Sequence, residues 1–222
     1  MSEATPSPNL NIGKLILIPS LITLGVSVLR LLGELQQWSP ILFGRTAGGG
    51  GALIGISWLP LILGPYFAWK LVRAGQGPAG CGRAIGYAVL GLGVFFAGAS
   101  IAFGQPFTAT RQLLGYLVMA AAVLPEFVCW RSFAKTLLAY AYAARIPVVV
   151  IMYFAIQGNW GTHYDALPPD VPVPADPLAR FAVIGLLPQL IFWVVYTVIV
   201  GGLLGSIFAA LVHRRPAPVS TS

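Results

Sequence analysis

Apolar runs of about 20 residues recur along almost the whole chain, and they constrain its fold more than any other feature. A helix needs about 20 such residues to cross the roughly 30 Å hydrocarbon layer of a membrane. Only 9% of the 222 residues are charged, whereas about 25% are charged in a typical soluble domain. The sequence therefore predicts an all-α, polytopic integral membrane protein whose first partner is the lipid bilayer.

The chain contains six apolar runs, and each predicts one transmembrane helix. Short polar segments join the runs, except for a longer segment at 158–180 that is rich in Pro and Asp and contains His163. The predicted organisation is a polar tail at 1–13, a six-helix domain at 14–213 with helices at 15–32, 51–71, 84–104, 113–130, 136–157 and 181–212, and a tail at 214–222.

Basic residues predict the orientation, because Lys and Arg in short loops are enriched on the cytoplasmic side. One set of helix ends carries Lys14, Lys70, Arg73, Arg83, Arg131, Lys135, Arg214 and Arg215, and the opposite set carries Arg30, Arg45, Arg111 and Arg180. This distribution predicts that both termini are cytoplasmic. The segment before the first run lacks a basic region, so we expect a retained helix instead of a cleaved signal. The composition, low in Lys but rich in Gly, Ala and Pro, suggests a bacterial inner membrane.

Several function classes are excluded by what the chain lacks. The net charge of +7 comes from scattered residues that do not alternate with aromatics on a polar face, so we expect no nucleic-acid partner. The two histidines, His163 and His213, fall at opposite ends of the predicted bundle and cannot clamp a haem. Cys81 and Cys129 form no metal-binding motif. We therefore expect no cofactor, no metal site and no catalytic residues.

Two charged residues, Glu126 and Arg145, lie further from the ends of the predicted helices than the others. Arg145 should lie near the middle of the membrane, where a cation costs about 2.5–3.5 kcal/mol or more and needs a partner. Glu126 is the nearest candidate, because side chains lean toward the N-terminus of their own helix and these two would lean toward each other. The sequence predicts a Glu126–Arg145 ion pair. The alternative pairs Glu126 with Arg131 or Lys135 at the membrane surface, with 131–145 as an amphipathic surface helix.

Two prolines interrupt the second predicted helix. Each of Pro60 and Pro65 removes a backbone hydrogen bond, and transporters use such broken helices to bind ions or substrates. The sequence thus allows a binding site at these prolines, with a simple kink as the alternative.

Small residues recur four positions apart on two predicted helices. Such rows let helix backbones approach closely within a membrane. They predict either packing within the chain or a face for a homo- or hetero-oligomer. The rows are Gly201 with Gly205, Gly202 with Ser206, and Gly93 with Ala97.

Three function classes agree with these features. A structural or accessory subunit of a membrane assembly explains the small-residue rows and the scarcity of reactive groups, and it is the first expectation. The alternative is a small-solute or ion transporter that uses the proline-broken second helix and the buried pair. A membrane enzyme fits least well, because catalysis needs a cluster of polar groups at one depth.

Overall fold

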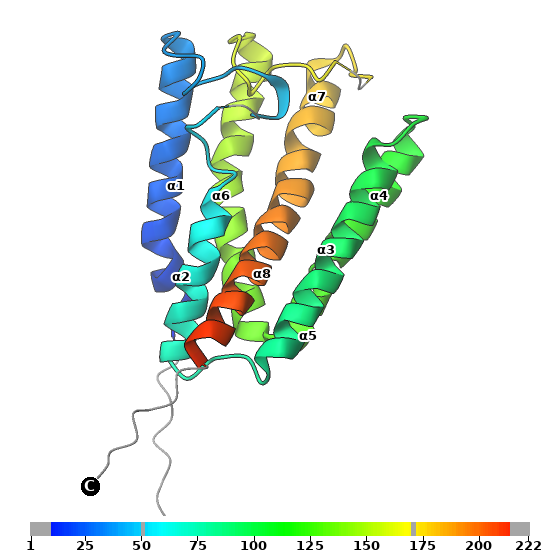
Figure 1. Cartoon of the computed structure of the whole chain (residues 1–222). Helices are drawn as coiled ribbons and strands as arrows, with labels where there is room; N and C mark the ends of the chain where they lie inside the picture. The colour runs from blue at the N-terminus through cyan, green and yellow to red at the C-terminus, as the bar shows by residue number, and fades with distance from the viewer. Residues whose placement is uncertain (1–9, 50–51, 170–171, 214–222) are drawn as a thin grey trace, which may run out of the picture.

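Every regular element is helical in the part of the chain that the computed structural model describes, residues 10–49, 52–169 and 172–213. The helices run side by side as a bundle (Figure 1). Five helical stretches are long and apolar enough to cross a membrane, which confirms an all-α, multi-pass membrane protein. In chain order the elements are α1 (Ile12–Leu35), η1 (Ala47–Gly49), α2 (Leu59–Arg73), α3 (Cys81–Phe103), α4 (Ala109–Ala121), α5 (Leu124–Cys129), α6 (Arg131–Gly158), α7 (Pro177–Arg180), η2 (Phe181–Leu186), η3 (Pro188–Phe192) and α8 (Trp193–His213).

The second apolar run forms a shorter helix than predicted. The predicted helix at 51–71, whose first residue lies outside the described part, is wrong for 52–58, because α2 begins only at Leu59. Pro60 occupies the first turn of α2, where no backbone N–H is needed. The helix cannot extend further upstream, since the ring of Pro60 would clash with the carbonyl of Ile56. The 15 residues of α2 reach only roughly 22 Å.

The predicted helix at 113–130 is also interrupted. A turn separates α4 from α5, because the ring of Pro125 would clash with the carbonyl of Ala121. Trp130 then breaks the chain between α5 and α6 with a non-helical backbone (φ −147°, ψ 73°). Its indole Nε1 donates a hydrogen bond of 2.7 Å to the carbonyl of Gln76. This bond ties the break to the loop between α2 and α3.

The last apolar run forms a nearly continuous helix that is not α-helical throughout. The segments η2 and η3 are π-helical, so their backbone hydrogen bonds join residues five apart. Pro188 begins η3 and has no N–H to donate. From Trp193 onward the chain is α-helical. The π-helical part lies over the cavity described below.

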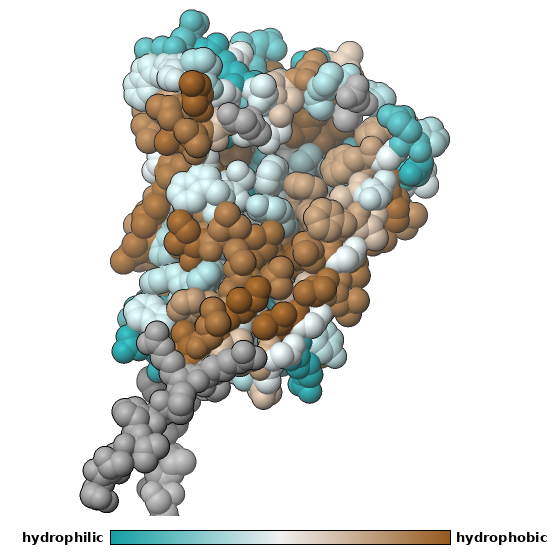
Figure 2. Space-filling view, in the orientation of Figure 1, coloured by the Kyte–Doolittle hydropathy of each residue, from teal (hydrophilic) through white to brown (hydrophobic). Residues whose placement is uncertain are grey.

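The helix α8 packs against α2, α3 and α6, while α3 and α4 form a hairpin (Figure 1). The start of α1 and the end of α8 lie at one end of the bundle, which we call the terminal end. The loops 36–49 and 159–169 lie at the opposite end, which we call the loop end. Apolar residues cover much of the flank between the two ends (Figure 2), as expected for a surface that contacts lipid.

The small-residue rows of α8 are used for packing within the chain. A methyl group on Gly64 of α2 would lie 2.6 Å from Cα of Gly201, so the two helix backbones touch. Gly205 packs against Phe133 of α6. Gly202 and Ser206 are also buried.

The predicted row on α3 behaves differently. Gly93 and Ala97 are exposed, and a methyl group on Gly93 would meet nothing within 4 Å. The glycines of α3 that pack closely are Gly91, against the carbonyl of Ala122, and Gly98, against the backbone of Met119. The row of Gly93 and Ala97 therefore makes no close helix contact within the chain.

Candidate functional site

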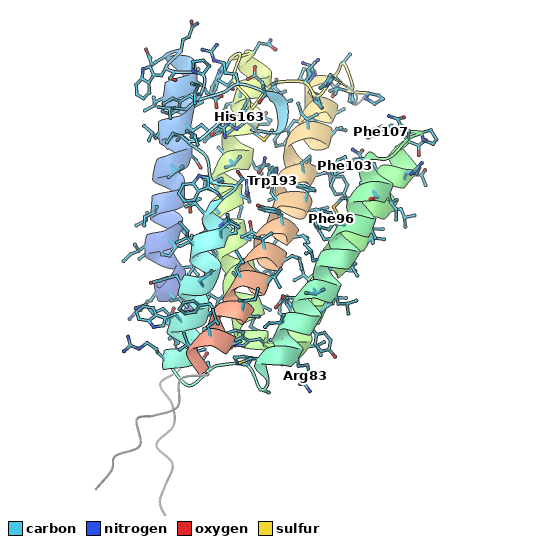
Figure 3. The ribbon with its side chains drawn as sticks, viewed as in Figure 1. Arg83, Phe96, Phe103, Phe107, His163 and Trp193 are labelled. Atoms are coloured by element: carbon cyan, nitrogen blue, oxygen red, sulfur yellow. The ribbon has the colours of Figure 1, made fainter. Side chains whose placement is uncertain are left out.

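A cavity of about 300 Å³ lies in the half of the bundle nearer the loop end. Its walls come from α1, α3, α4, α6, the π-helical segments, the start of α8, and loop residues at 48–49, 55–57 and 163–168. Figure 3 labels three of its lining residues, Phe103, His163 and Trp193, which belong to α3, the loop after α6, and α8. The polar side chains along its wall include Arg30, Gln112, Tyr116, Arg145, His163 and Gln189.

Arg145 is the charged group of the cavity wall with the fewest partners. It is only 4% exposed. Its Nη1 donates a weak hydrogen bond of 3.3 Å to Oε1 of Gln189, and its Cζ lies 4.8 Å from the ring centre of Trp193. Its Nε and Nη2 have no hydrogen-bond partner. These two nitrogens share one edge of the planar guanidinium, the edge that binds a carboxylate or phosphate through two parallel hydrogen bonds.

A second unpartnered polar group lines the same cavity. Tyr116 on α4 is 1% exposed, and its hydroxyl has no hydrogen-bond partner. Gln112 lies one turn earlier on the same helix and also faces the cavity. Buried polar groups are nearly always hydrogen-bonded in native proteins. The cavity therefore combines apolar walls with two buried residues, Arg145 on α6 and Tyr116 on α4, whose donors lack hydrogen-bond partners among the described residues.

The predicted ion pair between Glu126 and Arg145 does not form. Both carboxylate oxygens of Glu126 lack a hydrogen-bond partner, and its carboxyl group lies against Gly202. Arg145 instead contacts Trp193. Trp193 and Gly202 are nine residues, roughly 14 Å, apart along α8, which the lean of the two side chains cannot close. The alternative with Arg131 or Lys135 does not form either, because the described residues show no ion pair of Glu126.

A second charged cluster joins α1 to the loop after α6. Nε of Arg30 donates to Oε1 of Glu34 at 2.7 Å. The backbone N–H of His163 donates to Oε2 of Glu34 at 2.8 Å, and Nδ1 of the same residue contacts Oε1. Arg30 also donates to the carbonyls of Gly44 and Gly49. The cluster thus holds two loops onto α1 at the mouth of the cavity.

Sequence reasoning did not predict this cluster. The sequence assigned Arg30 only to an edge of the membrane, although its spacing of four residues from Glu34 is the usual signal for an ion pair on a helix. The contact of Glu34 with His163 joins residues 129 positions apart. No local pattern predicts such a contact.

We expect acid to weaken this cluster. Burial lowers the pKa of His163, although Glu34 acts in the opposite direction. An unfolded His has a pKa of about 6.5, so between the two values the unfolded chain binds more protons than the folded one. The contribution of His163 to stability is thus complete above about pH 6.5 and decreases as the pH falls. When the pH is lowered from about 7.5 to about 5.5, the unfolding temperature should decrease more for the wild type than for His163→Gln. An equal decrease of the unfolding temperature in the two proteins would contradict this role of His163.

The two prolines of the predicted broken helix lie outside the cavity lining. Pro60 and Pro65 both belong to α2 and do not line the cavity. The irregular segment before α2 does line it, through Gly55, Ile56 and Ser57. Non-helical backbone at membrane depth is tolerated only where protein or a cavity surrounds it. The second apolar run thus contributes to a cavity, but through the residues before its prolines.

Comparison with protein-family models, with curated proteins and with solved structures finds no match. Within the described residues, no group of three or more His, Cys, Asp or Glu side chains could hold a metal ion. The arrangement of Arg145, Gln189 and Tyr116 is suited to binding an anion by hydrogen bonds.

Proposed function

We propose that this chain is a membrane transporter that binds a small organic anion in the cavity of the loop end. The observation that carries the proposal is Arg145, a buried cation on the cavity wall whose Nε and Nη2 have no hydrogen-bond partner among the described residues. A carboxylate would accept two parallel hydrogen bonds from this edge and neutralise the charge. The hydroxyl of Tyr116 would supply a further hydrogen bond to a polar group of the ligand.

The apolar walls favour an anion that has a hydrophobic body. Phe103, Phe192 and Trp193 line the cavity together with aliphatic side chains. A volume of about 300 Å³ lies at the lower end of the usual range for ligand pockets. A small monocarboxylate with an aromatic or aliphatic body fits both properties. A second negative charge on the ligand would lack a cationic partner, because Arg30 is already bound to Glu34.

We prefer a transporter to the structural subunit that the sequence favoured. That expectation rested on the small-residue rows and on the scarcity of reactive groups, and two of the small residues, Gly201 and Gly205, contact helices of the same chain. The row of Gly93 and Ala97 is the exposed one, and it is available to lipid or to another subunit. The cavity and its unpartnered cation need a ligand to explain them, which a purely structural role does not provide.

The proposed topology has six crossings and both termini in the cytoplasm. The crossing that is second in chain order would be formed by α2 together with the irregular segment 52–58. The described basic residues at the terminal end outnumber those at the loop end, as on a cytoplasmic side. At the terminal end Lys70 and Arg73 lie over the ring of Trp69, a combination typical of a membrane interface. A bacterial inner membrane is the proposed location.

Ligand-induced stabilisation of the purified protein tests the proposal. Benzoate, benzamide and benzylamine have the same ring but carry negative, neutral and positive groups, and hexanoate is an aliphatic carboxylate. We expect the carboxylates to raise the unfolding temperature and to alter Trp fluorescence, because Trp193 lies against Arg145. Stabilisation should reach about 2.7 kcal/mol at a ligand concentration of 100 Kd. Equal effects of all the compounds, or no effect of either carboxylate, would contradict the proposal.

Transport itself is tested in vesicles that contain the purified protein. We expect uptake of a labelled carboxylate that stabilises the protein, and no uptake of the matched amine. Binding without uptake would indicate a membrane receptor or sensor instead of a transporter.

A further inference from the structure

Glu126 is a second buried charged residue, and it lies away from the cavity. Its side chain is 0% exposed, and neither of its carboxyl oxygens has a hydrogen-bond partner. The carboxyl group lies directly against Gly202 of α8, where any side chain would collide with it. Ser206 lies one turn further along the same helix, and its buried hydroxyl also lacks a partner. The space for the carboxyl group exists because residue 202 is Gly.

Among the described residues, no cation forms an ion pair with Glu126. On its own helix it interacts electrostatically with the Cys129 thiol, which in turn interacts with Arg83 at the start of α3. The basic residues at the start of α6, Arg131 and Lys135, are exposed. The facing turn of α8 offers only the hydroxyl of Ser206. A buried carboxylate without a partner is very costly, so the carboxyl group is held in its neutral form.

We infer that Glu126 is a proton-binding site, separate from the cavity, that exchanges its proton with water at the terminal end. The reaction is the simple ionisation in which the carboxyl group gives its proton to water and becomes a carboxylate. The path is short, because α5 ends three residues later at Cys129, roughly 4.5 Å along the helix. The chain is also non-helical at the next residue, Trp130.

A proton fits this site better than a metal cation. Sodium, calcium or magnesium would need several oxygen ligands. Glu126 supplies the carboxylate oxygens and Ser206 a hydroxyl, and within the described residues no second acid lies in a group that could hold a metal. One proton satisfies the carboxyl group without further ligands.

The proton site at Glu126 is separate from the cavity of the proposed transport, but it has a consequence for that transport. If the cavity carries an organic anion, an exchangeable proton near the opposite end of α8 would allow the movement of the anion to be coupled to the movement of the proton. Only this coupling rests on the proposed function. The proton site itself is tested without any organic anion, so that each can fail separately.

Infrared spectroscopy of the purified wild-type protein provides the test, because a protonated carboxyl group has a C=O stretching band that a carboxylate lacks. We expect such a band near neutral pH, a shift of the band in D₂O, and its loss when the pH is raised. Glu126→Gln should remove the band. Asp176→Asn, which changes an exposed acid that caps α7, should retain it.

Glu126→Asp covers the case in which the Gln variant does not fold. It keeps the acid but shortens the side chain, so the band should persist at a different frequency. A band that neither variant changes would overturn the inference. A band that responds neither to D₂O nor to pH would also overturn it, since the proton would then be permanently trapped. A carboxylate band whose intensity depends on sodium would overturn it in favour of a metal cation.

Discussion

Replacing Arg145 with Met should raise the thermal stability of the ligand-free protein and abolish carboxylate binding. The guanidinium is buried with two unpartnered nitrogens, and replacing buried charges by apolar groups of similar volume is often neutral or stabilises by about 1–4 kcal/mol. Binding should weaken because a charged hydrogen-bonded partner is worth about 2–5 kcal/mol. That range corresponds to a loss of affinity of roughly 30-fold to 4000-fold.

Two comparisons sharpen this experiment. Arg145→Lys keeps the charge but loses the two-donor edge, so binding should weaken by roughly 10-fold or more. Arg131→Met removes an exposed cation of the same helix and should leave carboxylate binding unchanged. A marked loss of stability in Arg145→Met would mean that the guanidinium has a structural role, and the cavity would lose its proposed anchor.

Replacing Gly64 with Ala should strongly destabilise the protein. The new methyl group would lie 2.6 Å from Cα of Gly201 and 2.8 Å from its carbonyl carbon, both backbone atoms that cannot rotate away. Adding a methyl group to a close-packed site typically costs about 1–3 kcal/mol, and occasionally more. The α2–α8 contact would have to open, which we expect to see as a lower unfolding temperature in detergent.

Gly93→Ala is the matched control for this substitution. It adds the same methyl group to a helical glycine, but at an exposed position of α3 with nothing within 4 Å. We expect a neutral or slightly stabilising effect, because Ala is favoured over Gly in helices by roughly 0.8–1.0 kcal/mol. Equal behaviour of Gly64→Ala and Gly93→Ala would mean that the α2–α8 contact is not close.

The fold class could be predicted because hydropathy is a local property of the sequence. Each predicted run contains a helix, and the burial of Arg145 followed from its distance to the nearest polar end. The breaks at Pro60 and Pro125 were harder to predict, because a proline can kink, start or end a membrane helix. The outcome depends on which neighbouring groups satisfy the backbone.

The partner of Arg145 could not be predicted from charge alone. The sequence predicted Glu126, the one acid within the membrane, as the partner of Arg145, and it relied on the lean of the two side chains to close their difference in depth. In the structure Arg145 lies 14 residues, roughly 21 Å, from the start of α6, whereas Glu126 lies beside that start. The neighbours of Arg145 in the structure, Gln189 and Trp193, are on the last helix and carry no charge.

The π-helical segments explain why the cavity wall was not visible in the sequence. A search for a helix face uses a period of 3.6 residues. The lining residues of this stretch are instead separated by both four and five positions, and five is the spacing of hydrogen-bonded residues in a π-helix. They are Val183, Ile184, Pro188, Gln189, Phe192 and Trp193. A standard helical projection would place them on different sides.

This spacing has a consequence for the evolution of the chain. A homologue with one residue fewer between 181 and 192 could form an ordinary α-helical turn in place of a π-helical turn. Its cavity wall between Val183 and Trp193 would then lack the widened turn that this chain has. Segment length, more than residue identity, should therefore divide homologues into those that keep this cavity wall and those that do not. An insertion or deletion within this stretch should be the first feature sought when homologous sequences are aligned.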